Sequence, residues 1–479
     1  MVLLTPLFIL SAPAQSPCDS HELPARLAAV VQSARARVTK GELPSIALTI
    51  ARNGSVLCET AFGWADRKKG LRATPYTVYA AGSVAKSVTG AAVFLLASRN
   101  KLRLDDAPER YGVAVRSYAG GGITIRELLS MTAGVQHGWF YNYSSEVDGG
   151  ALVHRYAIGA FRPGEHFIYS NFSFGILGEV IERAGKRPFR EFMRTEVLRP
   201  LHMSASGFNR AGPNVATGYQ AGRAVPSHSF EPEAGGGFYT TAHDLALFGS
   251  FQIDPAEQLI DPTLMKEMHT LQTEQQVKSH YTSGWGIFAF KDGSSVLISD
   301  GVVLAGSATL LLLPRAGVVI TCLTNTGTEA MDDLAFQVAD VFSPGLLASL
   351  DSTRKDMEVA HVSQPFHANP SQRGSWTGQL GLTMGQVPVR MLITEDQVQI
   401  GVGQDPMVPV SGLGLEQGFL SGEAAASLRL PETGKRASQV ALQLEWVKDD
   451  SLIGTARVES TDSLPHFGLP VYMSLSRAR

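Results

Sequence analysis

The 479-residue sequence has only three cysteines, at positions 18, 58 and 322, and none of them forms a CxxC pair. Thiols so few and so far apart indicate neither a zinc site nor a disulfide scaffold. A bridge between Cys18 and Cys58 stays open for an exported protein, whereas Cys322 lies in the apolar run 318–323 and is expected to pack in the core. The twelve histidines show no metal-binding spacing such as HExxH, so the sequence predicts no metal and no cofactor.

An excess of charge of one sign is also missing. Lysine and arginine total 41 against 44 aspartate and glutamate residues, and the longest basic run is 67–69. A nucleic-acid groove or a polybasic membrane surface is therefore not expected. No apolar run approaches 18 residues, which argues against a transmembrane anchor. The apolar stretch 2–10 and the small residues 12–14 instead predict a signal peptide and leader over 1–21, and hence a secreted or periplasmic protein.

Strands and helices are unevenly distributed along the chain. The predicted strands near the two ends of the first part are 46–52, 55–63, 307–313 and 318–323, the first two being joined by the turn Asn53-Gly54. The predicted helices between them are 83–98, 123–131 and 171–184. This order predicts one antiparallel sheet built from both ends of the region, with helices packed on it.

A polar stretch with two prolines, 351–372, separates this part from the rest. After it, apolar and polar residues alternate, as in 440–446, and no helical periodicity is present. The sequence therefore predicts a first domain over 22–345, a linker over 346–369 and a small β-barrel or sandwich over 370–479. The small domain either packs on the first domain, pairs subunits or binds a ligand.

The signatures of three large enzyme classes are absent: there is no GxSxG elbow, no P-loop and no GxGxxG fingerprint. Ser-x-x-Lys occurs three times, and only Ser83-Val84-Ala85-Lys86 opens an apolar helix. Ser83 would lie at the positive end of the helix dipole, with Lys86 one turn further on the same face. A buried lysine can lose its proton and accept one from the hydroxyl. The alternative is an N-capping serine beside a solvated surface lysine.

Two further motifs contain groups that suit the same chemistry. Tyr169-Ser170-Asn171 precedes another apolar helix. The tyrosine can relay protons if a nearby lysine holds its pKa down, and the asparagine can bond a lysine and a substrate carbonyl. The alternative is a buried tyrosine and an N-capping asparagine. Ser299-Asp300-Gly301 precedes the strand pair at 307–323, and a glycine there lets a substrate approach a strand edge, unless the motif is an ordinary turn.

In this order and at these distances, the three motifs resemble the serine β-lactamase and penicillin-binding protein superfamily, and above all its class C β-lactamase-like branch. Three further segments of the chain are similar to segments of that family, namely 123–135, 234–245 and 284–286. The resemblance covers about residues 40–330. It implies an α+β fold of the β-lactamase/transpeptidase type, with an antiparallel sheet flanked by helices and an all-helical subdomain.

The resemblance also implies residue roles. Ser83 would be acylated by a small-molecule ester, amide or peptide and then freed by water. Lys86 and Tyr169 would share the proton transfers, and Asn171 would orient Lys86 and the substrate. The backbone N–H groups of Ser83 and Val302 would form the oxyanion hole.

The third motif, which contributes Ser299 and Gly301, departs from the family at its first residue. Relatives place lysine or histidine where this chain has Ser299, and a cation there helps to hold a substrate carboxylate. Its loss favours a neutral ester or amide. The predicted function is therefore a serine hydrolase of the esterase or amidase kind. The alternatives are a D-amino-acid peptidase, a DD-carboxypeptidase or a β-lactamase, and a non-catalytic binding or assembly relative. The sequence predicts no oligomeric state.

Overall fold

The computed structural model describes Cys18 and residues 24–478, except for 144–146, 210–213, 227, 254–258, 291, 351–363, 383–384, 417, 427, 434–437 and 462–465. Apart from Cys18, the predicted signal peptide and leader over 1–21 lie outside the described residues, as does the middle of the predicted linker. Within the described ranges, no helix combines the length and the apolar character that a membrane span needs.

The first domain is built on an antiparallel sheet whose central strands come from opposite ends of the domain. β1 (Ser45–Arg52) and β2 (Ser55–Asp66) are joined at Asn53-Gly54, whose φ angles of 51° and 75° suit a tight hairpin turn. The other edge of β1 pairs with β17 (Val318–Thr324), which confirms the predicted sheet. The full order is β13-β14-β15-β16-β17-β1-β2-β3. The remaining strands are β3 (Leu71–Arg72), β13 (Tyr281–Thr282), β14 (Trp285–Ala289), β15 (Ser295–Val303) and β16 (Gly306–Leu313).

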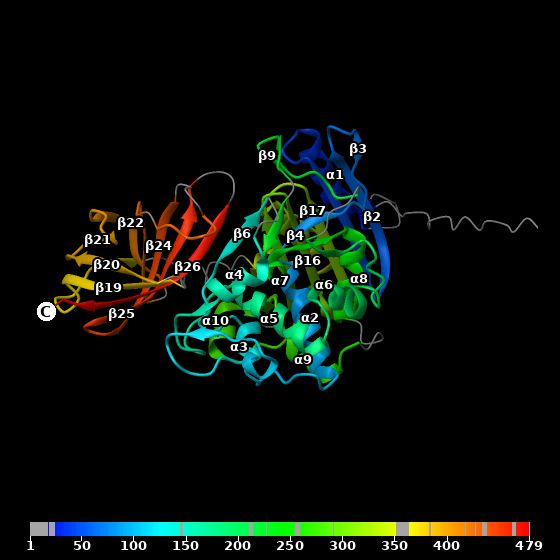
Figure 1. Ribbon diagram of the computed structural model, residues 1–479. Coiled ribbons are helices and arrows are strands. Elements are labelled where there is room, and N and C mark those ends of the chain that lie inside the picture. The colour runs from blue at the N-terminus through cyan, green and yellow to red at the C-terminus, as the bar shows by residue number, and fades with distance from the viewer. Residues whose placement is uncertain are drawn as a thin grey trace, which may run out of the picture.

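Helices cover both faces of this sheet (Figure 1). On one face, α1 (Ala25–Thr39) and α11 (Ala330–Phe342) enclose a separate apolar core. On the other face, α8 (Ala242–Ile253) packs on the central strands and is followed outward by the helical part of the domain.

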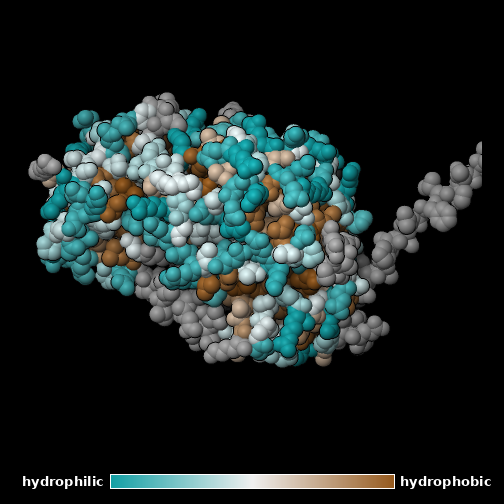
Figure 2. Space-filling model, turned by 90° about the horizontal axis from the view of Figure 1, so that it is seen from below, coloured by the Kyte–Doolittle hydropathy of each residue, from teal (hydrophilic) through white to brown (hydrophobic). Residues whose placement is uncertain are grey.

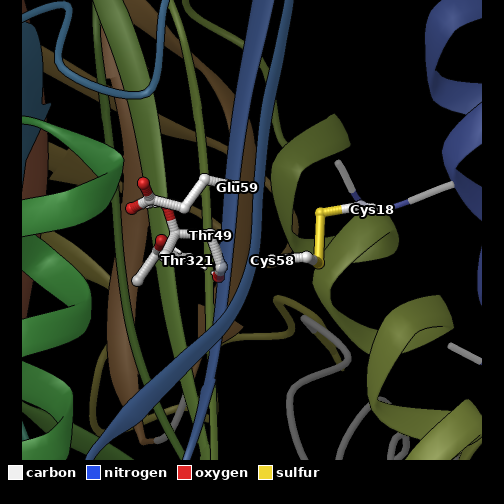
Figure 3. Close-up of a disulfide and its surroundings, with 5 residues drawn as sticks. All are labelled: Cys18, Thr49, Cys58, Glu59 and Thr321. Atoms are coloured by element: carbon white, nitrogen blue, oxygen red, sulfur yellow. Dashed lines mark hydrogen bonds between the residues drawn. A yellow bond between two sulfur atoms is a disulfide. The ribbon is translucent and has the colours of Figure 1, made fainter. Parts of the chain in front are cut away.

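A disulfide joins Cys18 to Cys58 on β2, so the bridge that the sequence left open is present. Figure 3 shows the bridge on the side of the strands opposite to Glu59, Thr49 and Thr321. Cys58 and Glu59 are neighbours on β2, so their side chains point to opposite faces of the sheet. The disulfide lies on the face covered by α1 and α11 and belongs to the apolar core there. Cys322 is a free and fully buried thiol, as predicted.

The helical part is centred on α2 (Ala85–Ser98) and α5 (Asn171–Gly185), which pack on each other. Residues 85–96 of α2 are all buried, and a helix that is apolar on every side belongs in a core. The shorter helices around this pair are α3 (Ile125–Leu129), α4 (Gly149–Tyr156), α6 (Phe189–Phe192), α7 (Glu233–Gly236), α9 (Pro262–Met268) and α10 (Glu274–Ser279).

The C-terminal part is a closed antiparallel barrel, drawn in yellow to red in Figure 1. Each strand pairs with the next along the chain from β19 (Gly374–Leu382) to β26 (Phe467–Arg477), and β26 pairs with β19 to complete the ring. Of the predicted barrel or sandwich, the barrel is the one formed. Its other strands are β20 (Gly385–Ile393), β21 (Val398–Val402), β22 (Val408–Glu416), β23 (Phe419–Ala424), β24 (Ser438–Lys448) and β25 (Ser451–Ser460).

The barrel packs on the first domain along β6 (Trp139–Asn142), which lies beside β26 in Figure 1. The Phe140 and Phe467 rings stack with their centroids 6.3 Å apart, and Thr455 donates a 2.8 Å hydrogen bond to Gln136 Oε1. Seen from below, the molecule presents mainly hydrophilic side chains with apolar groups scattered among them (Figure 2). The two parts also meet at the ion pair of Arg155 with Glu432 and at the stacked rings of Tyr118 and Tyr472. The segment 136–140 lies both at this interface and beside the site described next.

Candidate active site

Ser83 lies between a strand and the central helix. β4 (Tyr79–Gly82) ends at Gly82, whose φ of 54° turns the chain toward α2. The backbone N–H of Lys86 donates to the carbonyl of Ser83 at 2.9 Å, so the first helical turn brings the two side chains together. Ser83 is partly exposed, whereas Lys86 is only 1% exposed. The alternative of a solvated surface lysine therefore does not fit this structure.

Lys86 Nζ has three polar neighbours. It lies 2.9 Å from Ser83 Oγ, 2.7 Å from Asn171 Oδ1 and 2.5 Å from the carbonyl oxygen of Gly235. Burial lowers the pKa of Lys86 to about 7, against the opposing effect of the Asp300 charge. A neutral amine has two N–H donors and one lone pair. Because Asn171 and Gly235 accept the two N–H groups, the lone pair is left for the Ser83 hydroxyl.

The start of α5 leaves Asn171 free for this contact. Ser170 caps the helix, since its hydroxyl accepts a 3.0 Å hydrogen bond from the backbone N–H of Ser173. The alternative of an N-capping Asn171 therefore does not hold. The Asn171 amide nitrogen donates to the carbonyl of Gly138 at 3.2 Å, which fixes the amide oxygen toward Lys86.

Tyr169 donates a 2.7 Å hydrogen bond from its hydroxyl to Ser83 Oγ. Lys86 Nζ lies 4.7 Å from the centre of the Tyr169 ring. We expected a nearby lysine to hold the pKa of this tyrosine down, but desolvation of its hydroxyl raises that pKa above its usual value, although the side chain as a whole is 37% exposed. The desolvation cost of a tyrosinate outweighs the opposing hydrogen bond with Ser83, and the Asp300 charge raises the pKa of Tyr169 further. Tyr169 therefore stays protonated at neutral pH and acts as a donor.

β15 runs past the Ser83 turn, and alternate residues point to opposite sides. Ser299 and Gly301 are buried on the α2 side. The Ser299 hydroxyl donates to Ser87 Oγ at 2.8 Å, so it is directed into the core and away from the exposed face. A Cβ on Gly301 would lie 2.1 Å from the carbonyl oxygen of Ala81 and 2.4 Å from the Ser83 nitrogen. Only glycine lets β15 approach the Ser83 turn so closely.

Asp300 and Val302 are exposed and point to the opposite side of the same strand, the side on which α11 lies. A Cβ added to Gly82 would lie 3.1 Å from the backbone nitrogen of Val302, so the strand and the Ser83 turn are adjacent there. The two N–H groups expected to form the oxyanion hole thus come from neighbouring segments. Ser83, Lys86, Tyr169 and Asn171 are brought together with the backbone of Gly301 and Val302 beside them, while the Ser299 side chain is not part of the group.

Sequence reasoning missed two groups at this site. The carbonyl of Gly235 accepts a hydrogen bond from Lys86, and a Cβ on Gly235 would lie 2.9 Å from the Asn171 carbonyl oxygen. The glycines at 235–237 in the family-like segment 234–245 were the available signal. Asp300 is part of the motif Ser299-Asp300-Gly301, but the sequence predicted no role for it. Its negative charge raises the pKa of both Lys86 and Tyr169.

The chain is similar to known proteins over a large part of its length. Protein flp of Staphylococcus aureus is 27% identical over 320 residues, which are 62% of each chain. Esterase EstB of Burkholderia gladioli is 31% identical over 235 residues, 45% of this chain and 57% of that protein. The chain thus matches about three fifths of the length of these curated relatives.

The likeness in fold extends over the barrel. The structure of the octameric penicillin-binding protein homologue from Pyrococcus abyssi has a TM-score of 0.57 at 19% identity and covers 94% of this chain and 99% of its own. A family model described as Beta-lactamase matches residues 30–341, which include every side chain that meets Ser83. The chain therefore belongs to the beta-lactamase family.

Proposed function

We propose that this protein is a serine hydrolase that forms an acyl-enzyme on Ser83 and acts on small esters or amides. The observation that carries the proposal is the double contact of one hydroxyl: Ser83 Oγ lies 2.9 Å from Lys86 Nζ and 2.7 Å from Tyr169 Oη. One neighbour is an amine whose pKa is lowered to about 7, and the other is a phenol whose raised pKa keeps it protonated. A nucleophile with an adjacent base that a third group orients is the general arrangement for covalent catalysis.

The proposed reaction proceeds in two halves. Ser83 Oγ bonds to the substrate carbonyl carbon while its proton passes to the neutral Lys86 amine. The carbonyl oxygen becomes an oxyanion, which the backbone N–H groups of Ser83 and Val302 stabilise. The bond to the leaving group then breaks, and the leaving group takes its proton from the Lys86–Tyr169 pair. A water molecule cleaves the acyl-enzyme in the second half, with the same groups accepting its proton.

An esterase or amidase is favoured over the other activities of such a site. EstB, a relative that is 31% identical over the matched part, is named an esterase. We also propose a secreted or periplasmic location. The Cys18–Cys58 disulfide supports it, since disulfides persist in oxidising compartments.

The test is labelling of Ser83. The purified protein is treated with a fluorophosphonate and, separately, with a fluorescent penicillin, and the modified peptide is mapped. We expect the label on Ser83, and Ser83→Ala should lower p-nitrophenyl butyrate hydrolysis at least about a thousandfold. Ser98→Ala is the matched control, because Ser98 and Lys101 form a second Ser-x-x-Lys at the other end of α2. Labelling or esterase activity retained by Ser83→Ala would contradict the proposal.

A further inference from the structure

A cavity of about 350 Å³ lies between the outer face of the barrel and the residues Gln136 and His137 of the first domain. On the barrel side, Ser421 pairs with Gln443 and Gln443 pairs with Thr455, so a row of polar side chains crosses β23, β24 and β25. This row faces the first domain, because the Thr455 hydroxyl donates to Gln136 Oε1 at 2.8 Å. The two domains therefore build a polar cavity together.

The cavity lies beside the groups that would transfer protons. The ring of His137, which lines it, meets the ring of Tyr169 edge-on with the centroids 5.5 Å apart. Tyr169 in turn donates its 2.7 Å hydrogen bond to Ser83 Oγ. The path from Ser83 along Tyr169 to His137 is on the order of 10 Å, the length of about three extended residues. A substrate attached at Ser83 is therefore long enough to enter the cavity if it has the size of a short peptide.

Two buried polar atoms of the cavity wall have no partner in the described part of the chain. Gln136 is only 2% exposed, and its Oε1 accepts from Thr455 while its Nε2 donates to nothing there. The Nδ1 atom of His137 is likewise buried without a partner. Such atoms are costly to bury unpaired and are rare in folded proteins. Both lie in residues that line the same cavity, so a ligand there would satisfy them.

The two atoms define what the ligand must offer. Gln136 Nε2 is a donor and needs an acceptor. Burial lowers the pKa of His137 to about 3, so its ring is neutral and carries one proton. An unpaired buried N–H costs more than an unpaired acceptor, which assigns this proton to Nε2 and leaves a lone pair on Nδ1. The ligand must therefore present an acceptor and a donor side by side.

A neutral carboxamide meets both demands, whereas a charged group meets one at most. A carboxylate has no N–H for His137, and Arg457 on the cavity wall is already paired with Glu459 at 2.6 Å. An ammonium group has no acceptor for Gln136. Burial of a charge that lacks its partner is also far more costly than burial of an amide.

We propose that this cavity binds a carboxamide of the substrate, whose carbonyl oxygen accepts from Gln136 Nε2 and whose N–H donates to His137 Nδ1. The inference rests on the proposed function, because it names the substrate class of the same site. That class is esters or amides that carry a second amide group on the order of 10 Å from the reacting carbonyl.

Three terminal groups of similar shape separate the two hydrogen bonds. A carboxamide has the acceptor and the donor, a methyl ketone has the acceptor only, and an isopropyl group has neither. Each is placed about eight single bonds from the reacting carbonyl, to match the path to the cavity. Each is carried once in the acyl half of a p-nitrophenyl ester and once in the alcohol half of a butyrate ester, so that either half can reach the cavity. In one of these halves we expect kcat/KM of the carboxamide to exceed that of the ketone about tenfold.

The variants assign each hydrogen bond to one side chain. His137→Phe should bring the ratio of carboxamide to ketone close to one, and Gln136→Met should lower the ratio of ketone to isopropyl about tenfold. Gln399→Met is the matched control, because Gln399 lies on the barrel strand β21 and does not line the cavity. That control should keep both ratios of the unmodified protein. A ratio measured within one variant does not depend on the amount of folded enzyme, so a partly unfolded variant still gives a reading.

The outcomes separate the two proposals. If Ser83 is labelled and the esters are hydrolysed, but the ratio of carboxamide to ketone is close to one in both halves, the cavity holds water only and the hydrolase stands. A carboxamide preference that survives in both His137→Phe and Gln136→Met would also overturn the inference. If Ser83 is not labelled and no ester is hydrolysed, the proposed function fails and the amide site fails with it.

Discussion

At the scale of single residues, the proton acceptor is the most sharply testable part of the site. Only the uncharged form of Lys86 can take the Ser83 proton, and its pKa is lowered to about 7. The Lys86 charge also acts on the pKa of His137 and of Asp300, and His137 stays neutral because burial lowers its own pKa to about 3. We therefore expect kcat/KM for p-nitrophenyl butyrate to fall about tenfold for each pH unit below 7 and to level off above it. A flat profile between pH 5.5 and 8.5 would contradict this role.

Replacement of Lys86 by arginine tests the same role independently of pH. A guanidinium does not give up its proton in a protein, so it has no lone pair for the Ser83 hydroxyl. Lys86→Arg should therefore lower kcat/KM nearly as much as Lys86→Ala. The measurement is ester hydrolysis by both variants, with circular dichroism as the check on folding. An arginine variant that keeps more than about a tenth of the rate would make Lys86 a charge partner only.

The side chains that meet at Ser83 were predictable, and the direction of β15 side chains was not. Ser83, Lys86, Tyr169 and Asn171 stand in motifs whose order and spacing resemble the family. The direction of the Ser299 side chain depends on the register and twist of β15, which a three-residue motif does not determine. The contribution of Gly235 is a backbone carbonyl, and no side-chain pattern marks it.

At the scale of elements, the site depends on close approach of β15 to the Ser83 turn. Gly301→Ala would place a Cβ 2.1 Å from the Ala81 carbonyl oxygen and 2.4 Å from the Ser83 nitrogen. Both are backbone atoms, which cannot rotate away as a side chain could. We expect a loss of about 1–3 kcal/mol in stability from the overpacking and a drop of at least about a hundredfold in ester turnover. Gly122→Ala is the control, because a Cβ there meets nothing within 4 Å. Thermal melts and kcat/KM of the two variants decide, and unaltered turnover in Gly301→Ala would refute the close approach.

The long elements were predictable for a physical reason. The strands at 45–66 and 306–324 and the helices α2 and α5 have clear apolar periodicity or an Asn-Gly turn, and their predicted bounds differ from the observed ones by only a few residues. β4, β6 and α7 have four residues each, too few for any periodicity to appear. β4 ends at Gly82, β6 begins directly after Gly138, and α7 contains Gly235. The elements that the sequence did not predict are therefore mainly those that surround Ser83.

At the scale of the whole molecule, the barrel contacts a residue that orients one of the side chains at the active site. The carbonyl of Gly138 accepts the hydrogen bond that orients Asn171. A Cβ on Gly138 would lie 2.6 Å from the Gly468 carbonyl oxygen and 2.7 Å from Pro470 Cδ, so β26 presses directly on this residue. The position of the Asn171 amide, and through it that of Lys86, therefore depends on the barrel. The sequence left open whether this domain packs on the first, and its contacts with 136–140 show that it does.

Removal of the barrel should separate folding from catalysis. A protein that ends at Leu350 retains every strand of the first sheet and both helices that cover its outer face, so it should stay soluble and unfold cooperatively. Without β26 behind Gly138, Asn171 loses its fixed orientation, and we expect kcat/KM for p-nitrophenyl butyrate to fall at least about tenfold. Thr455→Val in the full chain is the milder comparison, since it removes only the hydrogen bond to Gln136. An insoluble truncated protein would show that the interface is needed for folding. Full activity in a soluble one would show that Gly138 keeps its place without the barrel.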